Sequence, residues 1–359
     1  MSFSFIPNVN SMKQIILVSM FTIAGFCSNA QTNEAVLKLV KEGIALHDKG
    51  DYEGAISKYD VALVIDKDDY DANYEKSLSC LYAKRYDDCI AISKYLLEKH
   101  KGNADIKAVY SNCGSAYDDK GDAENAIAMF DKGLKLFPDF YLLHYNKGLT
   151  LARLKKWDEA MPCFNAAMKI KPTHAGSLYY SSLAMEKSNK VAAIISGLCF
   201  LAVEPEGDRA KNMYEYLFEL FNSFAKKEGE KNTTIFISAD DLGDKKKENN
   251  FSMVNMMLGL TIASSLTDSV KATTDVAKLS LYMQMMASSL STGQKDGKGI
   301  YWKTYAPFLI EMKEKDQMDA FAHIASITSG NDENIKWIND NQDKLQSFYK
   351  WMQGYEWKK

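Results

Sequence analysis

Residues 49–63 read KGDYEGAISKYDVAL, a stretch in which small and aromatic residues recur at fixed intervals. Gly50 precedes the aromatic residue Tyr52, and Ala55 and Ala62 lie on either side of a second aromatic residue, Tyr59. Positions 55, 59 and 62 are separated by four and then three residues, the spacing that places side chains on one face of a helix. The stretch therefore predicts a helix that begins after Gly50 and packs this face against a neighbour.

The same pattern recurs further along the chain. The corresponding stretches begin at Ala83, Lys120, Leu154 and Ser188, at intervals of 34, 37, 34 and 34 residues. The interval of 37 is the same period with a three-residue insertion. A period of this length indicates stacked units, each made of two antiparallel helices and a tight turn. The units are expected at residues 36–69, 70–103, 107–140, 141–174 and 175–208.

Each recurring residue type has a physical role in such a unit. Gly50 and Gly121 stand where the first helix should end in a left-handed residue. Pro138 and Pro172 stop the second helix. Small residues are needed where two helices approach closely, and an aromatic residue four positions later shares their face. The small residues are Gly43, Gly114 and Gly148 in the first helix and Ala55, Cys89, Ala126 and Ala160 in the second; the aromatic residues are Tyr59, Phe130 and Phe164, with Tyr52, Tyr86 and Trp157 opening the second helix and packing on the first.

On these residues, the range 31–208 resembles the tetratricopeptide repeat family. The resemblance implies an all-α solenoid of about five helix-turn-helix repeats that binds its partner in a concave groove. The second unit departs from the family pattern, with Ser77 and Ser93 in place of the small glycine and the aromatic residue. The fifth unit has aliphatic residues at the diagnostic positions Val191, Ile194 and Leu198. It is therefore a degenerate repeat, and one interpretation is that it caps the array.

The resemblance also implies which residues contact a protein or peptide partner. The candidate residues in the groove are Tyr74, Leu78, Tyr145, Leu149, Tyr179 and Leu183. Tyrosine suits an interface because its ring buries apolar area while its hydroxyl still forms hydrogen bonds. These positions lack the Lys, Arg and Asn with which other members of the family hold a terminal carboxylate. The groove is expected to bind an apolar peptide or helix, or else to be filled by the chain's own C-terminal half.

The N-terminus has the pattern of a signal peptide over residues 1–30. Lys13 precedes a short apolar run at residues 15–26, and small residues lead to a cleavage site after Ala30. The run is shorter than the roughly 20 apolar residues that span a membrane. The mature protein is therefore expected to be exported, to the periplasm or to the cell surface and medium, without stable membrane insertion. Residues 268–270, DSV, resemble the glycosylation signal of exported Bacteroidota proteins.

Residues 209–359 lose the period and are expected to form a second, α-helical domain. The elements expected there are an amphipathic helix over 209–227, a short β-prone segment at 233–238, two buried helices within 251–292 divided near Thr267, helices near 301–328, and a last helix from Asn331 or Asp332 through Trp357. Six methionines punctuate residues 251–292 and are interpreted as core residues.

Composition and motifs argue against several classes of function. The formal net charge is −3, so the chain has no basic excess with which to bind nucleic acid. The sequence lacks phosphate-loop, zinc-protease and hydrolase motifs, and no catalytic residue, metal ligand or cofactor is assigned. One alternative is an enzyme with converging carboxylates in a polar cleft near residues 228–250 or 293–302. Another is a glycan- or small-ligand-binding protein with a row of exposed rings, Trp302, Trp351 and Trp357.

Two interpretations remain for Cys80 and Cys89, which fall on the two helices of the second unit. An oxidising compartment would permit a disulfide between these facing helices. Alternatively, both are small buried apolar side chains.

Overall fold

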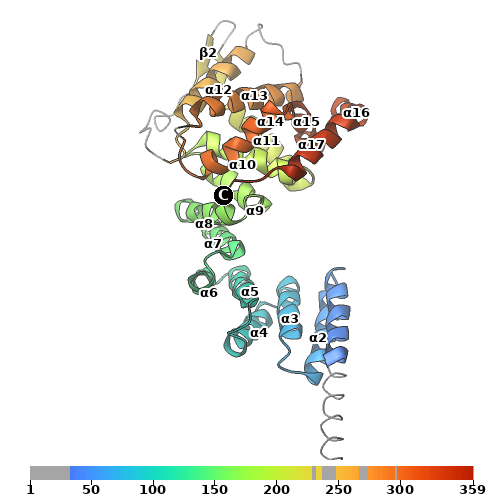
Figure 1. Cartoon of the computed structure of the whole chain (residues 1–359). Helices are drawn as coiled ribbons and strands as arrows, with labels where there is room; N and C mark the ends of the chain where they lie inside the picture. Colours follow the sequence, from blue (N-terminus) through green and yellow to red (C-terminus); the bar gives the residue numbers. More distant parts are fainter. Residues whose placement is uncertain (1–32, 229–231, 237–247, 267–273, 296, 359) are drawn as a thin grey trace, which may run out of the picture. The chain divides into compact units, whose positions relative to one another are not determined.

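The computed structural model of the chain describes residues 33–228, 232–236, 248–266, 274–295 and 297–358. The described residues form two compact units, which divide between Pro138 and Asp139. Figure 1 labels the helices and strands of both. The expected signal peptide and the DSV segment at 268–270 lie outside the described residues.

The first unit consists of consecutive helical hairpins. Residues 33–47 are helical and are followed by α2 (Tyr52–Ile65), α3 (Tyr70–Tyr82), α4 (Tyr86–Lys99), α5 (Ile106–Asp119) and α6 (Ala123–Leu136). From α2 to α6, each helix packs on the next one along the chain. The helices start and stop where the repeat pattern predicts them.

The turns between helices are set by a few side chains. Asp51, Asp69 and Asp122 each accept a hydrogen bond from the backbone N–H three residues further on, which caps the following helix. Gly50 and Gly121 have φ angles of 81° and 93°, which confirms the predicted left-handed residue at the end of the first helix. Lys84 and Lys155 also have positive φ, 60° in each case, although their side chains disfavour this conformation.

The glycine and aromatic positions of each repeat lie against one another. A Cβ atom added at Gly43 would lie 2.3 Å from Cε1 of Tyr59, and one added at Gly148 would lie 2.6 Å from Cε1 of Phe164. Both aromatic side chains are fully buried. The close approach of the two helices therefore requires the missing side chain, as the repeat pattern predicts. In the second repeat, Ser77 and Ser93 hold these positions and both are fully buried.

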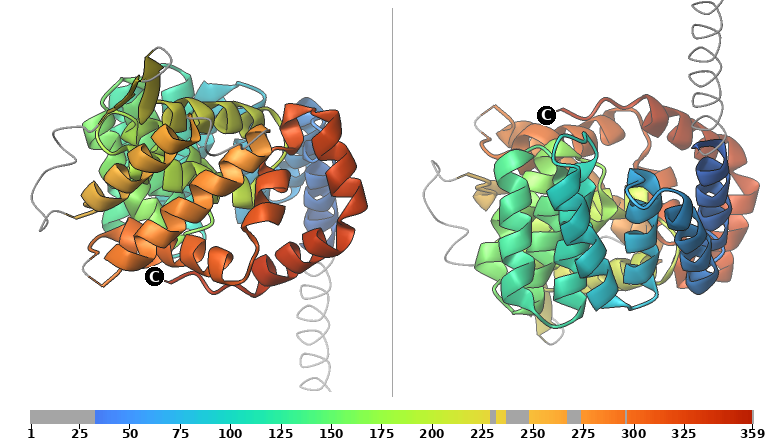
Figure 2. Two further views of the ribbon diagram at one scale, coloured as in Figure 1. Left: turned by 90° about the horizontal axis from the view of Figure 1, so that it is seen from above. Right: turned by 90° about the horizontal axis from the view of Figure 1, so that it is seen from below.

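The second unit continues the hairpins and then adds further helices. Its elements are α7 (Tyr141–Arg153), α8 (Trp157–Ile170), α9 (Ala175–Met185), α10 (Lys190–Val203), α11 (Asp208–Asn222), β1 (Ala225–Glu228), β2 (Asn232–Ile235), α12 (Ser252–Ser265), α13 (Asp275–Gly293), the π-helix η2 (Tyr301–Tyr305), α14 (Ala306–Glu314), α15 (Met318–Ala325), the 3-10 helix η3 (Ile327–Ser329), α16 (Asp332–Asp340) and α17 (Gln342–Gly354). Helices α12 and α13 pack together, as do α13 and α14 (Figures 1 and 2).

Helix α10 lies at the centre of the second unit's core. Every residue from Val191 to Ala202 is buried, on all faces of the helix. It packs against α9 and α11 and also against η2, α12 and α15. A capping repeat would present a polar outer face to solvent. The interpretation of the fifth repeat as a cap is therefore wrong, because the C-terminal helices cover α10.

Two tyrosines of η2 connect it to the repeats of this unit. The hydroxyl of Tyr301 is fully buried and lies 2.7 Å from Ser181 Oγ on α9, and it accepts a hydrogen bond of 3.2 Å from Ser196 Oγ on α10. The hydroxyl of Tyr305 donates to the carbonyl of Pro172 at 3.0 Å. These bonds satisfy buried polar groups and fix η2 against the last two repeats.

Three sequence-based expectations for the C-terminal half need correction. Helix α11 ends at Asn222 instead of 227, because the chain turns into the antiparallel hairpin of β1 and β2, which pairs Ala225 with Ile235. The last helix is two helices, which meet at Asn341. Met253 and Met256 are exposed instead of buried, although the expected core placement is correct for Met283 and Met286.

Three other fold expectations are confirmed, and the domain boundary expected after residue 208 stays a prediction. Residues 251–292 contain two helices, α12 and α13, and Asn331 caps α16 through hydrogen bonds from the N–H groups of Glu333 and Asn334. Apart from the β1–β2 hairpin, the elements of the described residues are helical, so the all-α class is correct. Among the described residues, no helix has the length and apolar character needed to cross a membrane.

Candidate functional site

Tyr74 and Leu78, the two candidate contact residues of the first unit, lie one turn apart on α3 and are both half-buried. The ring of Tyr74 is parallel to that of Tyr70, with ring centroids 6.0 Å apart, and it packs against the buried cluster of Leu96, Ile106 and Val109. Burial raises the pKa of the Tyr74 hydroxyl. This ring therefore contributes to packing between repeats while part of its surface stays accessible.

Tyr145 on α7 mainly joins two helices of the second unit. Its ring centroid lies 4.6 Å from that of His174, and a Cβ atom added at Gly176 would lie 2.6 Å from its hydroxyl oxygen. Burial raises the pKa of the Tyr145 hydroxyl to about 12. Tyr179 on α9 contacts the ring of Phe200 at 5.2 Å and lies under the guanidinium of Arg209 at 5.8 Å. Both tyrosines are half-buried.

Leu149 and Leu183 complete the set and are also half-buried. Leu183 lines a hollow of about 750 Å³ together with Trp157, and we call this cavity the Trp157 hollow. It lies between the turn after α7 and the C-terminal end of α9. Its charged rim carries both signs and consists of Lys155, Lys156, Asp158, Glu159, Glu186 and Lys187.

The surroundings of Trp157 differ from those that the sequence predicts. It was expected to pack on the preceding helix, as the equivalent aromatic residues Tyr52 and Tyr86 do in part. Instead, 37% of its surface is exposed. A partly exposed tryptophan beside an aliphatic side chain in a concave surface is typical of hot-spot residues, which contribute most of the binding free energy at a protein interface. Its position at the start of α8 was the only signal in the sequence.

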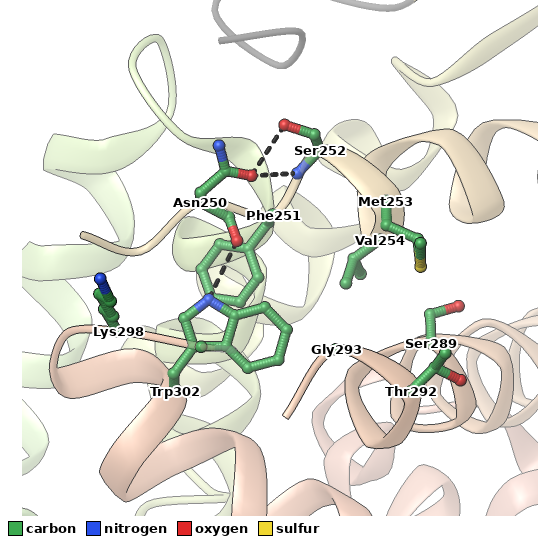
Figure 3. Close-up of a pocket in the computed structure, with 11 residues that line it drawn as sticks. Asn250, Phe251, Ser252, Met253, Val254, Ser289, Thr292, Gly293, Lys298 and Trp302 are labelled. Atoms are coloured by element: carbon green, nitrogen blue, oxygen red, sulfur yellow. Dashed lines mark hydrogen bonds between the residues drawn. The ribbon is translucent and has the colours of Figure 1, made fainter. Parts of the chain in front are cut away.

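A second, smaller cavity of about 190 Å³ lies between the N-terminal end of α12 and the C-terminal end of α13 (Figure 3). Trp302 forms one wall, stacked on Phe251 with centroids 4.7 Å apart, and its indole N–H donates to the carbonyl of Asn250 at 3.0 Å. Val254 lies on the α12 side (Figure 3). The cavity is lined by one ionisable side chain, Lys298, and by no carboxylate.

One alternative places an enzyme site near residues 228–250 or 293–302. Gly293, Gly297, Lys298 and Trp302 of the second range line this cavity, and its lining contains no carboxylate. Much of 228–250 lies outside the described residues. Within the described ranges, no three His, Cys, Asp or Glu side chains are grouped so that they could hold a metal ion.

The proposed row of exposed tryptophans is wrong. Trp302 is buried, and Trp351 and Trp357 both stack on Phe308, at centroid distances of 5.3 and 4.6 Å. Phe308 is itself fully buried. Trp351 and Trp357 are partly buried and pack against the core near α14 and α17 instead of presenting faces to a sugar.

Cys80 and Cys89 are free, buried thiols. Burial raises the pKa of Cys80 to about 11 and that of Cys89 to about 12. A thiol must lose its proton to act as a nucleophile or a metal ligand, so both side chains behave as small apolar core residues in this state.

A comparison with protein-family models agrees with the repeat architecture. A family model described as tetratricopeptide repeat matches residues 114–175. Solved structures that resemble part of the chain include a thermophilic repeat protein of Thermus thermophilus, with 18% identity over 52% of this chain and 98% of that one and a TM-score of 0.44. PilF of Pseudomonas aeruginosa matches with 18% identity over 53% of this chain and 86% of that one, at a TM-score of 0.46.

A third solved structure, YrrB, is described as a repeat protein with an unusual peptide-binding site. It has 18% identity over 53% of this chain and 97% of its own, at a TM-score of 0.38. The search of curated proteins gave no match. The family model, the 34-residue period and the glycine–aromatic pairs agree that the chain contains tetratricopeptide repeats.

Proposed function

We propose that this protein is an exported, non-catalytic scaffold that binds a protein or peptide through the surface of its repeats. The tetratricopeptide repeat fold supports a protein–protein interaction scaffold. The signal-peptide pattern at residues 1–30 supports export, to the periplasm or beyond. The candidate contact residues are Tyr74 and Leu78 in the first unit and Tyr145, Leu149, Tyr179 and Leu183 in the second.

The observation that carries this proposal is the Trp157 hollow. Trp157 and Leu183 offer apolar surface inside a concavity, and lysines and acidic residues surround it. An apolar partner side chain would displace water from the hollow, while polar groups around that side chain would find partners of either sign on the rim. The partner that fits best is therefore a peptide or helix with an exposed apolar anchor between charged residues.

The test starts with affinity capture from envelope and medium fractions, with the mature chain as bait. The captured partner is identified, purified and titrated against four chains: wild type, Trp157→Ala, Leu183→Asp and the control Tyr349→Ala, which removes an exposed ring elsewhere in the same unit. Truncation of an interface hot spot costs about 2 kcal/mol or more, which corresponds to about a 30-fold rise in Kd.

The expected result is that Trp157→Ala and Leu183→Asp weaken binding by this factor or more while Tyr349→Ala leaves it unchanged. Circular dichroism verifies that each variant is folded. Equal affinity of all four chains would overturn the role of the Trp157 hollow. Recovery of the chain from the cytoplasmic fraction with residues 1–30 still attached would overturn export.

A further inference from the structure

Helix α12 carries large apolar side chains on two opposite faces, yet only one of these faces is covered. Its sequence, SMVNMMLGLTIASS, contains no charged residue. The buried face carries Val254, Leu258 and Ile262. A helix that is hydrophobic all round is normally buried all round. Here the opposite face is open to solvent in the second unit.

The exposed face is a stripe formed by residues 253, 256, 257 and 260, which we call the α12 stripe. Met253, Met256 and Leu260 are 54%, 45% and 49% exposed, and Met257 is half-buried. The spacing of three, one and three residues places all four side chains on one side of the helix. Exposed apolar stripes of this kind mark surfaces that bind another molecule.

We propose that the α12 stripe is the interface of a homodimer, in which α12 packs antiparallel against α12 of a second copy. The spacing of the four apolar positions in the stripe is the same from either end of the helix. When two copies are related by a two-fold axis between positions 256 and 257, Met253 lies opposite Leu260 of the second copy. Met256 then lies opposite Met257. A two-fold interface pairs one patch with itself, and this stripe meets that requirement.

The absence of charge on α12 favours a second copy as the occupant. In a two-fold interface, every charged side chain near the axis faces its own image, and like charges in contact are costly. No such charge lies on α12. Methionine side chains are flexible and adapt to the surface that they meet, so the three methionines suit an interface.

The cavity of Figure 3 adds a matching recess at one end of the stripe. Met253 belongs to both the stripe and the cavity lining, which it shares with Phe251, Val254 and Trp302 (Figure 3). In the antiparallel pair, Leu260 of the second copy comes next to Met253. Its side chain is therefore placed to enter the recess, and each copy would contribute one side chain and one recess.

The proposal is tested by the mass of the mature chain in solution, measured by analytical ultracentrifugation over a range of concentrations. Wild type is expected to form a dimer. Met256→Lys and Met256→Glu place like charges near the axis, and each variant alone is expected to dissociate at least about tenfold more readily. An equimolar mixture of the two is expected to restore the dimer, because opposite charges then meet at the axis. Ile335→Lys changes an exposed apolar residue of α16 and serves as the matched control.

The charge pair also separates loss of the interface from loss of the fold, because an unfolded variant would not be rescued by mixing. Thermal unfolding of each chain alone provides the second check. A wild-type chain that stays monomeric at every concentration would overturn the proposal. So would a dimer that Met256→Lys leaves intact, or two monomeric variants that fail to associate when mixed.

Discussion

A methyl group added at Gly114 would lie 2.3 Å from Cε1 of Phe130, closer than real Cβ atoms approach a neighbour. Phe130 is fully buried and comes sixteen residues after Gly114 in the sequence. The pairs Gly43–Tyr59 and Gly148–Phe164 repeat this contact at the same separation. The distance between the two helices of these repeats is thus set by an aromatic ring that packs directly on the backbone of a glycine.

We expect Gly114→Ala to lower the free energy of unfolding by about 1–3 kcal/mol, because the ring of Phe130 must shift within a packed core. Urea unfolding measures the change. Gly102→Ala is the control, since nothing lies within 4 Å of a Cβ atom added there; it should change stability by no more than about 0.5 kcal/mol. Equal effects of the two substitutions would show that the clash does not set the helix spacing.

Lys84 holds a left-handed turn that glycine holds in the first and third repeats. We expect Lys84→Gly to raise the free energy of unfolding by up to about 1 kcal/mol, because relief of the strained φ outweighs the entropy of an added glycine. Gly121→Ala is the reverse change and should destabilise by about as much. If Lys84→Gly lowers the unfolding midpoint, the lysine conformation is not strained.

Tyr301→Phe removes the hydroxyl that bonds to Ser181 and Ser196 in the buried centre of the second unit. The two serine hydroxyls would lose their shared partner, which costs about 1–3 kcal/mol. Tyr349→Phe removes the hydroxyl of a partly exposed ring and should be close to neutral. The two variants are compared by chemical unfolding, and a neutral Tyr301→Phe would mean that these hydroxyls find other partners.

His174 makes stability depend on pH. Its Nδ1 accepts the N–H of Ser177 at 3.2 Å as the cap of α9, and burial, aided by Lys171 and Arg209, lowers the pKa of His174 from 6.5 to about 4. The unfolded chain takes up this proton at a higher pH than the folded chain. The contribution of His174 is therefore complete above pH 6.5 and is lost progressively as pH falls toward 4.

His174→Asn keeps a side-chain acceptor at this cap but cannot be protonated. The variant should lose less stability than wild type when the pH is lowered through this window. Urea midpoints measured at several pH values give the two slopes. Parallel slopes for the two chains would contradict the assignment, because other titrating groups contribute equally to both.

The sequence predicts best those features that depend on neighbours in the chain. The pairing of Gly114 with Phe130 is local, and both residue types are required by sterics, so the repeats and their turns follow from the pattern. The left-handed Lys84 is indicated only by its alignment with Gly50 in the repeat, because no property of a lysine by itself indicates positive φ. The last helix is interrupted at Asn341, whose side-chain amide donates a hydrogen bond to the carbonyl of Trp337. This local contact competes with the helix backbone, and the regular spacing of aromatic residues across 331–357 gave no sign of it.

The candidate site was predicted only in part, because exposure depends on distant residues. Leu183 was identified from its position in the repeat, and it lines the Trp157 hollow. The exposure of Trp157 was missed, since the same position carries a more buried tyrosine in two other repeats. Likewise, the exposed Met253 and Met256 could not be separated from the buried Met283 and Met286 without knowing which helices surround α12.

The burial of α10 has a consequence for the order in which the two units fold. In the first unit from α2 to α6, each helix packs on the next along the chain. These contacts join residues that are close in sequence, so forming them closes only short loops of chain. The bond between Ser196 and Tyr301 closes a separation of 105 residues, and α10 also packs against α15 further on. Such long-range contacts form slowly, because the entropy of a long loop must be lost before they stabilise the chain. The first unit should therefore fold early, while α10 stays uncovered and prone to aggregation until residues 301–325 reach it.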